Sequence, residues 1–170
     1  MRQWTLPAAI GAAVLSSSSA AESPVQGVAS GIYDGDLQSD NSFKAIDSAT
    51  EDLPNSMRPL ARMRLRKSVA VSRIRISAAG SRIGIAYDAK APITLWIGED
   101  PVKWKLIDIL VFDVSAKYVD QALSIRFRGD DSDRTTTYRN VGRNLEENTT
   151  IIVPHLPTPI VFKRVFHRAN

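Results

Sequence analysis

From Val69 to the C-terminus, apolar and polar residues alternate with a period of two, in short blocks. The alternation is clearest at 83–87, 93–97 and 123–127, and glycine, proline and aspartate separate the blocks. This pattern is typical of strands that bury one face. The segment 105–114 is almost continuously apolar, which favours a central strand covered on both faces. No segment shows the period of an amphipathic helix.

Seven or eight such strands predict an all-β fold: a single-domain antiparallel β-sandwich that occupies residues 68–170. Because the chain has no cysteine, its stability must come from packing rather than disulfides. Large aromatic side chains are the natural anchors of the core. These are Trp96, Trp104, Phe112, Phe127, Phe162 and Phe166.

The first twenty residues have the pattern of an export signal. Arg2 precedes the apolar stretch 6–15, and small residues follow up to Ala20. The apolar stretch is too short to span a bilayer, and no later stretch is longer. We therefore expect residues 1–20 to be a signal peptide and the protein to be secreted, without a membrane anchor.

Residues 21–67 differ in composition from the rest. Between 22 and 56 there are seven acidic residues and one lysine, and the apolar residues follow no period. Such a segment predicts a disordered acidic pro-segment. A cluster of cations follows and ends in the dibasic pair Arg66-Lys67, which is typical of a processing site. The alternative is a basic strand or a solvated run of charge.

Composition and motifs exclude several functions. The absence of cysteine excludes thiol chemistry, and the dispersed cations of a chain with net charge +4 argue against nucleic-acid binding. His155 and His167 belong to no catalytic motif, and no phosphate-binding loop is present. We therefore expect no enzymatic activity and no cofactor.

An Arg-Gly-Asp tripeptide is the main candidate binding site in the sequence. Arg128-Gly129-Asp130 follows directly on the alternating block 123–127, so it should form the exposed tip of a hairpin, with Asp131 and Asp133 as supporting residues. The spacing of the acids in this loop matches the start of an EF-hand calcium loop, but the sequence lacks the glycine and the final glutamate of that loop, so we expect no metal. The alternative is an ordinary charged turn. Asn148 begins an N-glycosylation sequon, which we place in a loop.

Taken together, the signal, the acidic segment, the β-rich domain and the run 109–137, ILVFDVSAKYVDQALSIRFRGDDSDRTTT, resemble the ToxA-type host-selective toxins of plant-pathogenic fungi. The resemblance implies a secreted β-sandwich whose Arg-Gly-Asp loop mediates entry into sensitive plant cells. Arg128, Gly129 and Asp130 would then be uptake residues. Toxins of that family usually carry one disulfide, which this chain cannot form.

Two functions follow. In the first, the protein is a toxin that binds a host-plant cell-surface component, is translocated into the cell, and causes death by contacting an intracellular host protein without catalysis. In the second, it is a generic extracytoplasmic binding module for a glycan or an envelope protein. The Arg-Gly-Asp tripeptide is then incidental, and a sheet face or Trp96 and Trp104 make the contact. The oligomeric state is open in both.

Overall fold

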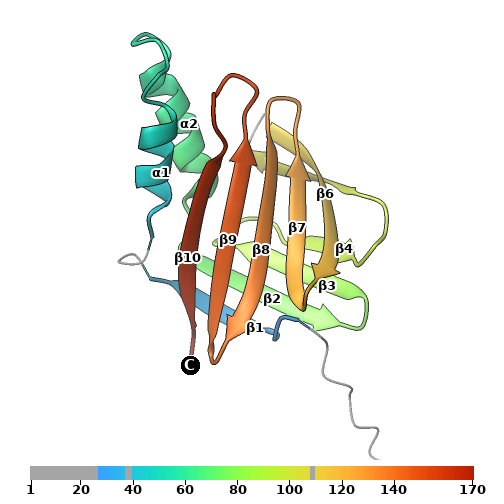
Figure 1. Cartoon of the computed structure of the whole chain (residues 1–170). Helices are drawn as coiled ribbons and strands as arrows, with labels where there is room; N and C mark the ends of the chain where they lie inside the picture. Colours follow the sequence, from blue (N-terminus) through green and yellow to red (C-terminus); the bar gives the residue numbers. More distant parts are fainter. Residues whose placement is uncertain (1–26, 37–39, 108–109) are drawn as a thin grey trace, which may run out of the picture.

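The computed structural model describes residues 27–36, 40–107 and 110–170, so the predicted signal peptide lies outside the described residues. The described strands are all joined in one ten-stranded antiparallel sheet that curls into a nearly closed barrel (Figure 1). In chain order the strands are β1 (Gly31–Gly35), β2 (Arg73–Ala79), β3 (Arg82–Tyr87), β4 (Ile93–Trp96), β5 (Val102–Ile107), β6 (Leu110–Val119), β7 (Ala122–Arg128), β8 (Asp133–Val141), β9 (Asn144–Ile152) and β10 (Ile160–Arg168). Two helices, α1 (Ser42–Ala49) and α2 (Arg58–Val69), lie between β1 and β2.

The predicted fold class is therefore wrong. The order β4-β3-β2-β1-β10-β9-β8-β7-β6-β5 shows that β1 pairs with β2 on one side and with β10 on the other. Without β1 the sheet would fall into two halves. A count of strands that starts at Ser68 omits this connecting strand, so a two-sheet sandwich was predicted where one continuous barrel exists.

The barrel closes between the two ends of this order. β4 and β5 are the outermost strands, and the chain just after β4 forms a parallel bridge between Ile97 and Ala116 of β6. The backbone N–H of Gly98 also donates to the carbonyl of Ala116, at 3.0 Å. The ends of the sheet therefore meet through a few contacts rather than a full ladder.

Residues 21–67, predicted to be a disordered pro-segment, include α1 and most of α2. α1 begins where the carboxylate of Asp40 accepts the backbone N–H of Ser42 (2.8 Å), and Pro59 fits the first turn of α2, where no N–H is required. Arg66 of α2 donates to the carboxylate of Asp47 in α1 at 2.6 Å. The acids and cations that suggested a cleavable pro-segment thus pair with one another. Neither helix in the described ranges is long and apolar enough to cross a bilayer.

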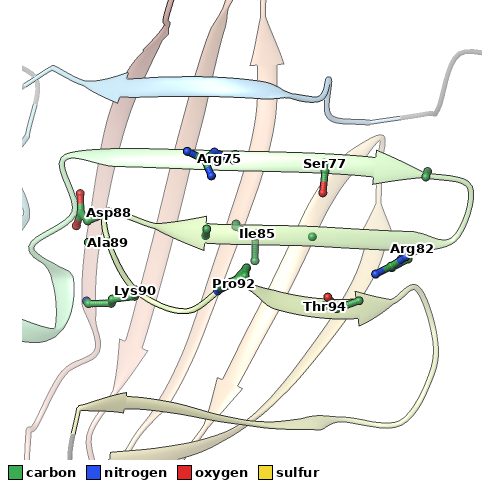
Figure 2. Close-up of a pocket in the computed structure, with 12 residues that line it drawn as sticks. Arg75, Ser77, Arg82, Ile85, Asp88, Ala89, Lys90, Pro92 and Thr94 are labelled. Atoms are coloured by element: carbon green, nitrogen blue, oxygen red, sulfur yellow. The ribbon is translucent and has the colours of Figure 1, made fainter.

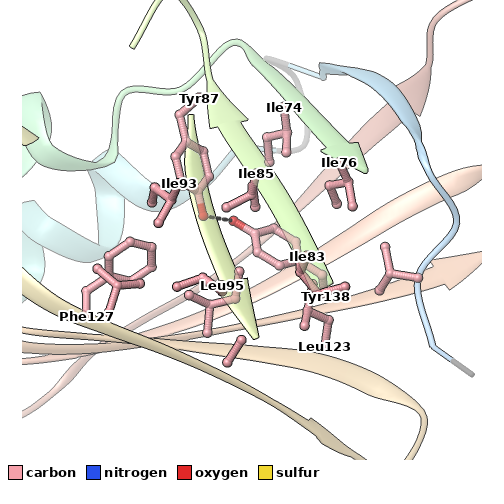
Figure 3. Packing of buried hydrophobic residues seen from close by; sticks show 14 of the residues in the cluster. Ile74, Ile76, Ile83, Ile85, Tyr87, Ile93, Leu95, Leu123, Phe127 and Tyr138 are labelled. Carbon is pink, nitrogen blue, oxygen red and sulfur yellow. Dashed lines mark hydrogen bonds between the residues drawn. The ribbon is translucent and has the colours of Figure 1, made fainter. Parts of the chain in front are cut away.

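The alternating blocks have their apolar side inward, as predicted. Ile74 and Ile76 of β2, and Ile83 and Ile85 of β3, are at most 2% exposed and meet Leu123 and Tyr138 from the opposite wall (Figure 3). Side chains therefore fill the barrel away from the helices. A second apolar cluster joins the helices to β9 and β10 through Ile46, Val69, Ile151, Ile160 and Phe162.

Five of the six expected aromatic anchors are buried, and one is not. Trp96 points outward from β4 and is 45% exposed. The apolar run 105–114 is not one doubly covered strand, because β5 ends at Ile107 and β6 begins at Leu110. Within β6, Val111 is exposed and Phe112 is buried, so this strand alternates like the others.

Charged residues also lie inside the barrel. Arg164 of β10 and Glu147 of β9 are 2% and 0% exposed, and the guanidinium Nη2 donates to the carboxylate Oε1 at 2.7 Å. Arg164 Nη1 donates to the carbonyl of Val69 at the end of α2, at 2.7 Å. Burial opposes the charge of Arg164, but the field and hydrogen bond of Glu147 outweigh it and raise the Arg164 pKa. The pair therefore ties the last turn of α2 to the sheet.

We expect Glu147→Ala to lower the free energy of unfolding by about 3–5 kcal/mol, because it leaves Arg164 as an unpaired buried charge. The adjacent Glu146 faces outward and pairs with Lys163 at 2.9 Å. Glu146→Ala should cost no more than about 1 kcal/mol. Urea unfolding of the two variants makes the comparison, and similar losses would contradict the role given to the buried pair.

Candidate functional site

A cavity of about 330 Å³ lies between α2 and the adjacent end of the barrel. Ala61, Leu65 and Ser68 of α2 form one wall. The connections on either side of α2, the strands β3 and β5 to β9 with the β3–β4 and β7–β8 turns, and the connection between β9 and β10 supply the other lining residues. Pockets that hold small molecules are typically about 300–1,000 Å³. This cavity therefore has room for a ligand of modest size.

Aromatic rings form its apolar floor. The ring centroids of Tyr87 and Trp104 lie 6.2 Å apart, and those of Trp104 and Phe127 lie 5.8 Å apart. Phe112 meets Phe127 edge-on at 6.4 Å. All four side chains line the cavity. Rings from β3, β5, β6 and β7 thus present one continuous apolar surface to whatever enters beneath α2.

Cations dominate the charge around this surface. Arg64, Lys90 and Arg134 line the cavity against a single carboxylate, that of Asp131. Burial lowers the pKa of Lys90. The neighbouring cations Arg134 and Lys67 lower this pKa further, whereas the carboxylate of Asp88 raises it. The positive charges at the cavity therefore repel one another.

Arg134 is the most deeply placed of these cations. Its side chain is 13% exposed, and its guanidinium lies 5.3 Å from the centroid of the Phe127 ring. Nε donates to Thr136 Oγ1 at 3.0 Å and Nη1 to the carbonyl of Ser68 at 3.3 Å. Nη2 only approaches Glu147 Oε1, at 3.7 Å. Arg134 therefore keeps donor capacity toward the cavity, while Arg164 takes most of the charge of Glu147.

The structure places the predicted loop beside this cavity. Arg128 ends β7, and Asp130 and Asp131 are exposed in the turn to β8. The backbone N–H of Gly129 donates to the carbonyl of Ser132 at 2.8 Å, which closes the turn. Arg126 forms a bidentate ion pair with Asp133, and this partner lowers the Asp133 pKa.

Packing alone accounts for glycine at position 129. A Cβ atom there would lie 2.9 Å from Cε1 of Phe112, one of the rings of the cavity floor. A larger residue would therefore require the Phe112 ring to shift, whether or not Arg128 and Asp130 bind a receptor. Receptor binding by these residues stays a prediction.

The other predicted site residues lie elsewhere. Arg66 and Lys67 are in the last turn of α2, and cleavage there stays a prediction. Asn148 is exposed but lies within β9, opposite Lys163, rather than in a loop. Trp104 lines the cavity, whereas Trp96 points outward, so the two tryptophans share no surface.

The sequence analysis gave no role to Lys90 or Arg134, which line the cavity. The spacing of Arg134 from Thr136 and Tyr138 places it on the inward face of β8. That alternation was the available signal. The cavity itself depends on α2, which the sequence analysis did not predict.

No family model matches the sequence, and neither does any curated protein. Solved structures do match in fold. A secretory abundant heat soluble protein from Ramazzottius varieornatus has a TM-score of 0.59 at 12% identity, covering 82% of this chain and 94% of that one. The REP1-NXSQ fatty acid transporter has a TM-score of 0.55 at 15% identity, covering 83% and 96%. Zebrafish ileal bile acid-binding protein, solved with cholic acid, has a TM-score of 0.54 at 12% identity, covering 82% and 98%. The chain shares the fold of these proteins.

The tyrosines of the interior predict how stability changes in alkali. Burial raises the pKa of Tyr87 to about 12, and the Tyr87 hydroxyl lies 3.1 Å from that of Tyr138. The unfolded chain loses this proton near pH 10, so the folded state binds more protons above that pH. The contribution of Tyr87 to stability should be fully present below pH 10 and fall by roughly 2–3 kcal/mol as the pH approaches 12. Burial also raises the pKa of Tyr138, which adds to the decline.

Tyr87→Phe should make this decline with pH shallower, and should cost about 1 kcal/mol at pH 7 through the lost hydrogen bond. Urea unfolding at pH 7, 9, 10 and 11 measures both effects. An identical decline in the variant would show that Tyr87 ionises normally in the folded protein.

Proposed function

We propose that the protein binds a small lipophilic ligand with an anionic head group in the cavity beneath α2. The observation that carries this proposal is the joint presence of an aromatic floor and a largely buried guanidinium, that of Arg134, in one cavity of about 330 Å³. The apolar body of the ligand packs on Trp104, Phe112 and Phe127. Its head group lies within reach of Arg134 and Lys90.

Electrostatics supports an anionic rather than a neutral head group. Arg134 is mostly shielded from water, and the pKa of Lys90 is lowered by burial and by neighbouring cations. An anion between them relieves this repulsion, and charge-assisted hydrogen bonds are about twice as strong as neutral ones. A cationic ligand would add to the repulsion.

The filled part of the barrel limits the ligand. Tyr33, Ile74, Leu145 and Phe166 are fully buried and belong to the cluster that fills the interior away from α2. The ligand is therefore held at the helical end and does not run the length of the barrel. The named relatives in fold include a fatty acid transporter and a bile acid-binding protein, and both of those ligand classes are anionic amphiphiles.

The toxin hypothesis makes a separate claim, that Arg128 and Asp130 bind a host-cell component. Both side chains are exposed at the β7–β8 turn. That claim stays a prediction, and so does secretion. Neither bears on ligand binding in the cavity.

Decanoate and decanol, which differ only in the head group, test the proposal by calorimetry at pH 7. We expect wild-type protein to bind decanoate more tightly. Arg134→Met should weaken decanoate binding by about 10- to 100-fold, because a hydrogen-bonded charge is worth about 1.5–3 kcal/mol, and should change decanol binding little. Arg143→Met removes an exposed cation of the β8–β9 turn and serves as control. If wild-type protein binds neither compound, the proposal fails.

Decanoate binding should also depend on pH through Lys90. The bound carboxylate favours protonated Lys90, whose pKa in the free protein lies below its ordinary value of 10.5. Affinity should therefore be full at neutral pH and fall as the pH rises toward 10. Lys90→Met should bind more weakly at pH 7 and lose this dependence. A wild-type affinity that stays constant from pH 7 to 10 would place the head group away from Lys90.

A further inference from the structure

A second cavity, of about 580 Å³, lies on the outer face of β2, β3 and β4 (Figure 2). The inward neighbours on these strands, among them Ile76, Ile83 and Leu95, are buried in the barrel core. The outward residues that line the cavity therefore face solvent. This groove is separate from the cavity beneath α2, although Lys90 borders both.

The groove carries cations without local partners. Some cations on the outer face of the barrel pair with acids on neighbouring strands, as Lys103 does with Asp113 at 2.8 Å. Arg75 instead lies opposite Ala86 and Ile32, and Arg82 lies opposite Ala79 and Trp96. Within the described chain neither guanidinium has a hydrogen-bond or ion-pair partner.

The acid that lines the groove, Asp88, offsets only part of this positive charge. Oδ1 of Asp88 accepts the backbone N–H groups of Ser72 and Arg73, both at 2.9 Å, and the Ser72 hydroxyl at 2.7 Å. Asp88 therefore serves to close the end of the β2–β3 pair. Arg75, Arg82 and Lys90 leave the groove with a net positive charge.

The register of the strands sets the spacing of the cations. Arg75 is level with Ala86, and Arg82 lies four residues before Ala86 on β3. At about 3.3 Å per residue the two arginines are anchored roughly 13 Å apart along the groove. Figure 2 shows Arg82 toward one end of the strands and Lys90 toward the other. A single phosphate or carboxylate cannot engage both ends.

The floor between the cations carries two hydroxyl groups. The Ser77 hydroxyl lies over Gly84, because a Cβ atom at Gly84 would be 2.4 Å from its oxygen. Thr94 lies on the other side of Gly84. An extended molecule in the groove can therefore meet both hydroxyl groups. Trp96, 45% exposed, offers a ring beside Arg82.

We propose that this groove binds an extended acidic glycan, whose carboxylate or sulfate groups pair with Arg75 and Arg82 and whose sugar rings lie on the Ser77–Gly84 floor and against Trp96. A glycan carries its acid groups on separate sugar rings, which suits widely spaced cations. A nucleic-acid strand carries a phosphate on every nucleotide, so two arginines anchored roughly 13 Å apart would leave most of its charges unpaired.

Calorimetry with a hyaluronan octasaccharide, which carries one carboxylate on every second sugar ring, tests the proposal in 150 mM NaCl. We expect Arg75→Gln and Arg82→Gln each to weaken binding at least fivefold, and the double variant at least twentyfold. Arg143→Gln removes the same charge outside the groove and should weaken it less than twofold. Decanoate binding should be unchanged in all these variants, so this site and the cavity beneath α2 can fail independently.

Several results would overturn the proposal. Equal losses in Arg143→Gln and Arg82→Gln would mean that only net charge attracts the octasaccharide. Tighter binding of an eight-nucleotide deoxythymidine oligomer, with the same dependence on Arg75 and Arg82, would make the groove a nucleic-acid site. Absence of binding by the wild-type protein at millimolar octasaccharide would exclude the glycan.

Discussion

The position of β1 between β2 and β10 is the constraint on which the rest of the structure depends. Through its two ladders, five residues from Gly31 to Gly35 join the halves of the sheet into one barrel. β2 is antiparallel to β1 and adjacent to it, so a two-residue hairpin would have sufficed to connect them. The chain instead places both helices in this connection, and α2 thereby forms one wall of the cavity at that end of the barrel.

Buried charge then links this wall to the barrel interior. Arg164 donates to the carbonyl of Val69, where α2 ends, and to Glu147. Glu147 also accepts the Thr149 hydroxyl at 2.8 Å, and Thr149 in turn lies 2.9 Å from Thr136, the partner of Arg134. Removal of one charge from such a network exposes the others to an apolar interior. The network that holds α2 in place therefore also determines how much charge Arg134 presents to the cavity.

The sequence predicted the buried faces of most strands but neither the number of strands nor their assembly. Local alternation shows that Ile83 and Ile85 share a buried face, but a sandwich and a barrel need the same alternation. The barrel differs from the sandwich in the strand Gly31–Gly35, which joins the two parts of the sheet. Its two glycines, its aspartate and its single fully buried side chain, Tyr33, give no alternating pattern that predicts a strand. Arg66 looked like a processing site because its partner, Asp47, is 19 residues away and becomes its neighbour only when the helices pack.

The meaning of the Arg-Gly-Asp tripeptide also depends on contacts that form only in the folded protein. Gly129 belongs to an Arg-Gly-Asp tripeptide, yet its backbone is pressed against Phe112 and its N–H closes the β7–β8 turn. The same turn contributes Asp131 and Ser132 to the mouth of the cavity, next to the aromatic floor. A substitution in the tripeptide can therefore alter ligand binding by moving Phe112, without any receptor. An effect of a Gly129 variant on cell entry must therefore be compared with the effects of Arg128 and Asp130 variants. The side chains of Arg128 and Asp130 are exposed, so their substitution leaves the packing of Phe112 intact.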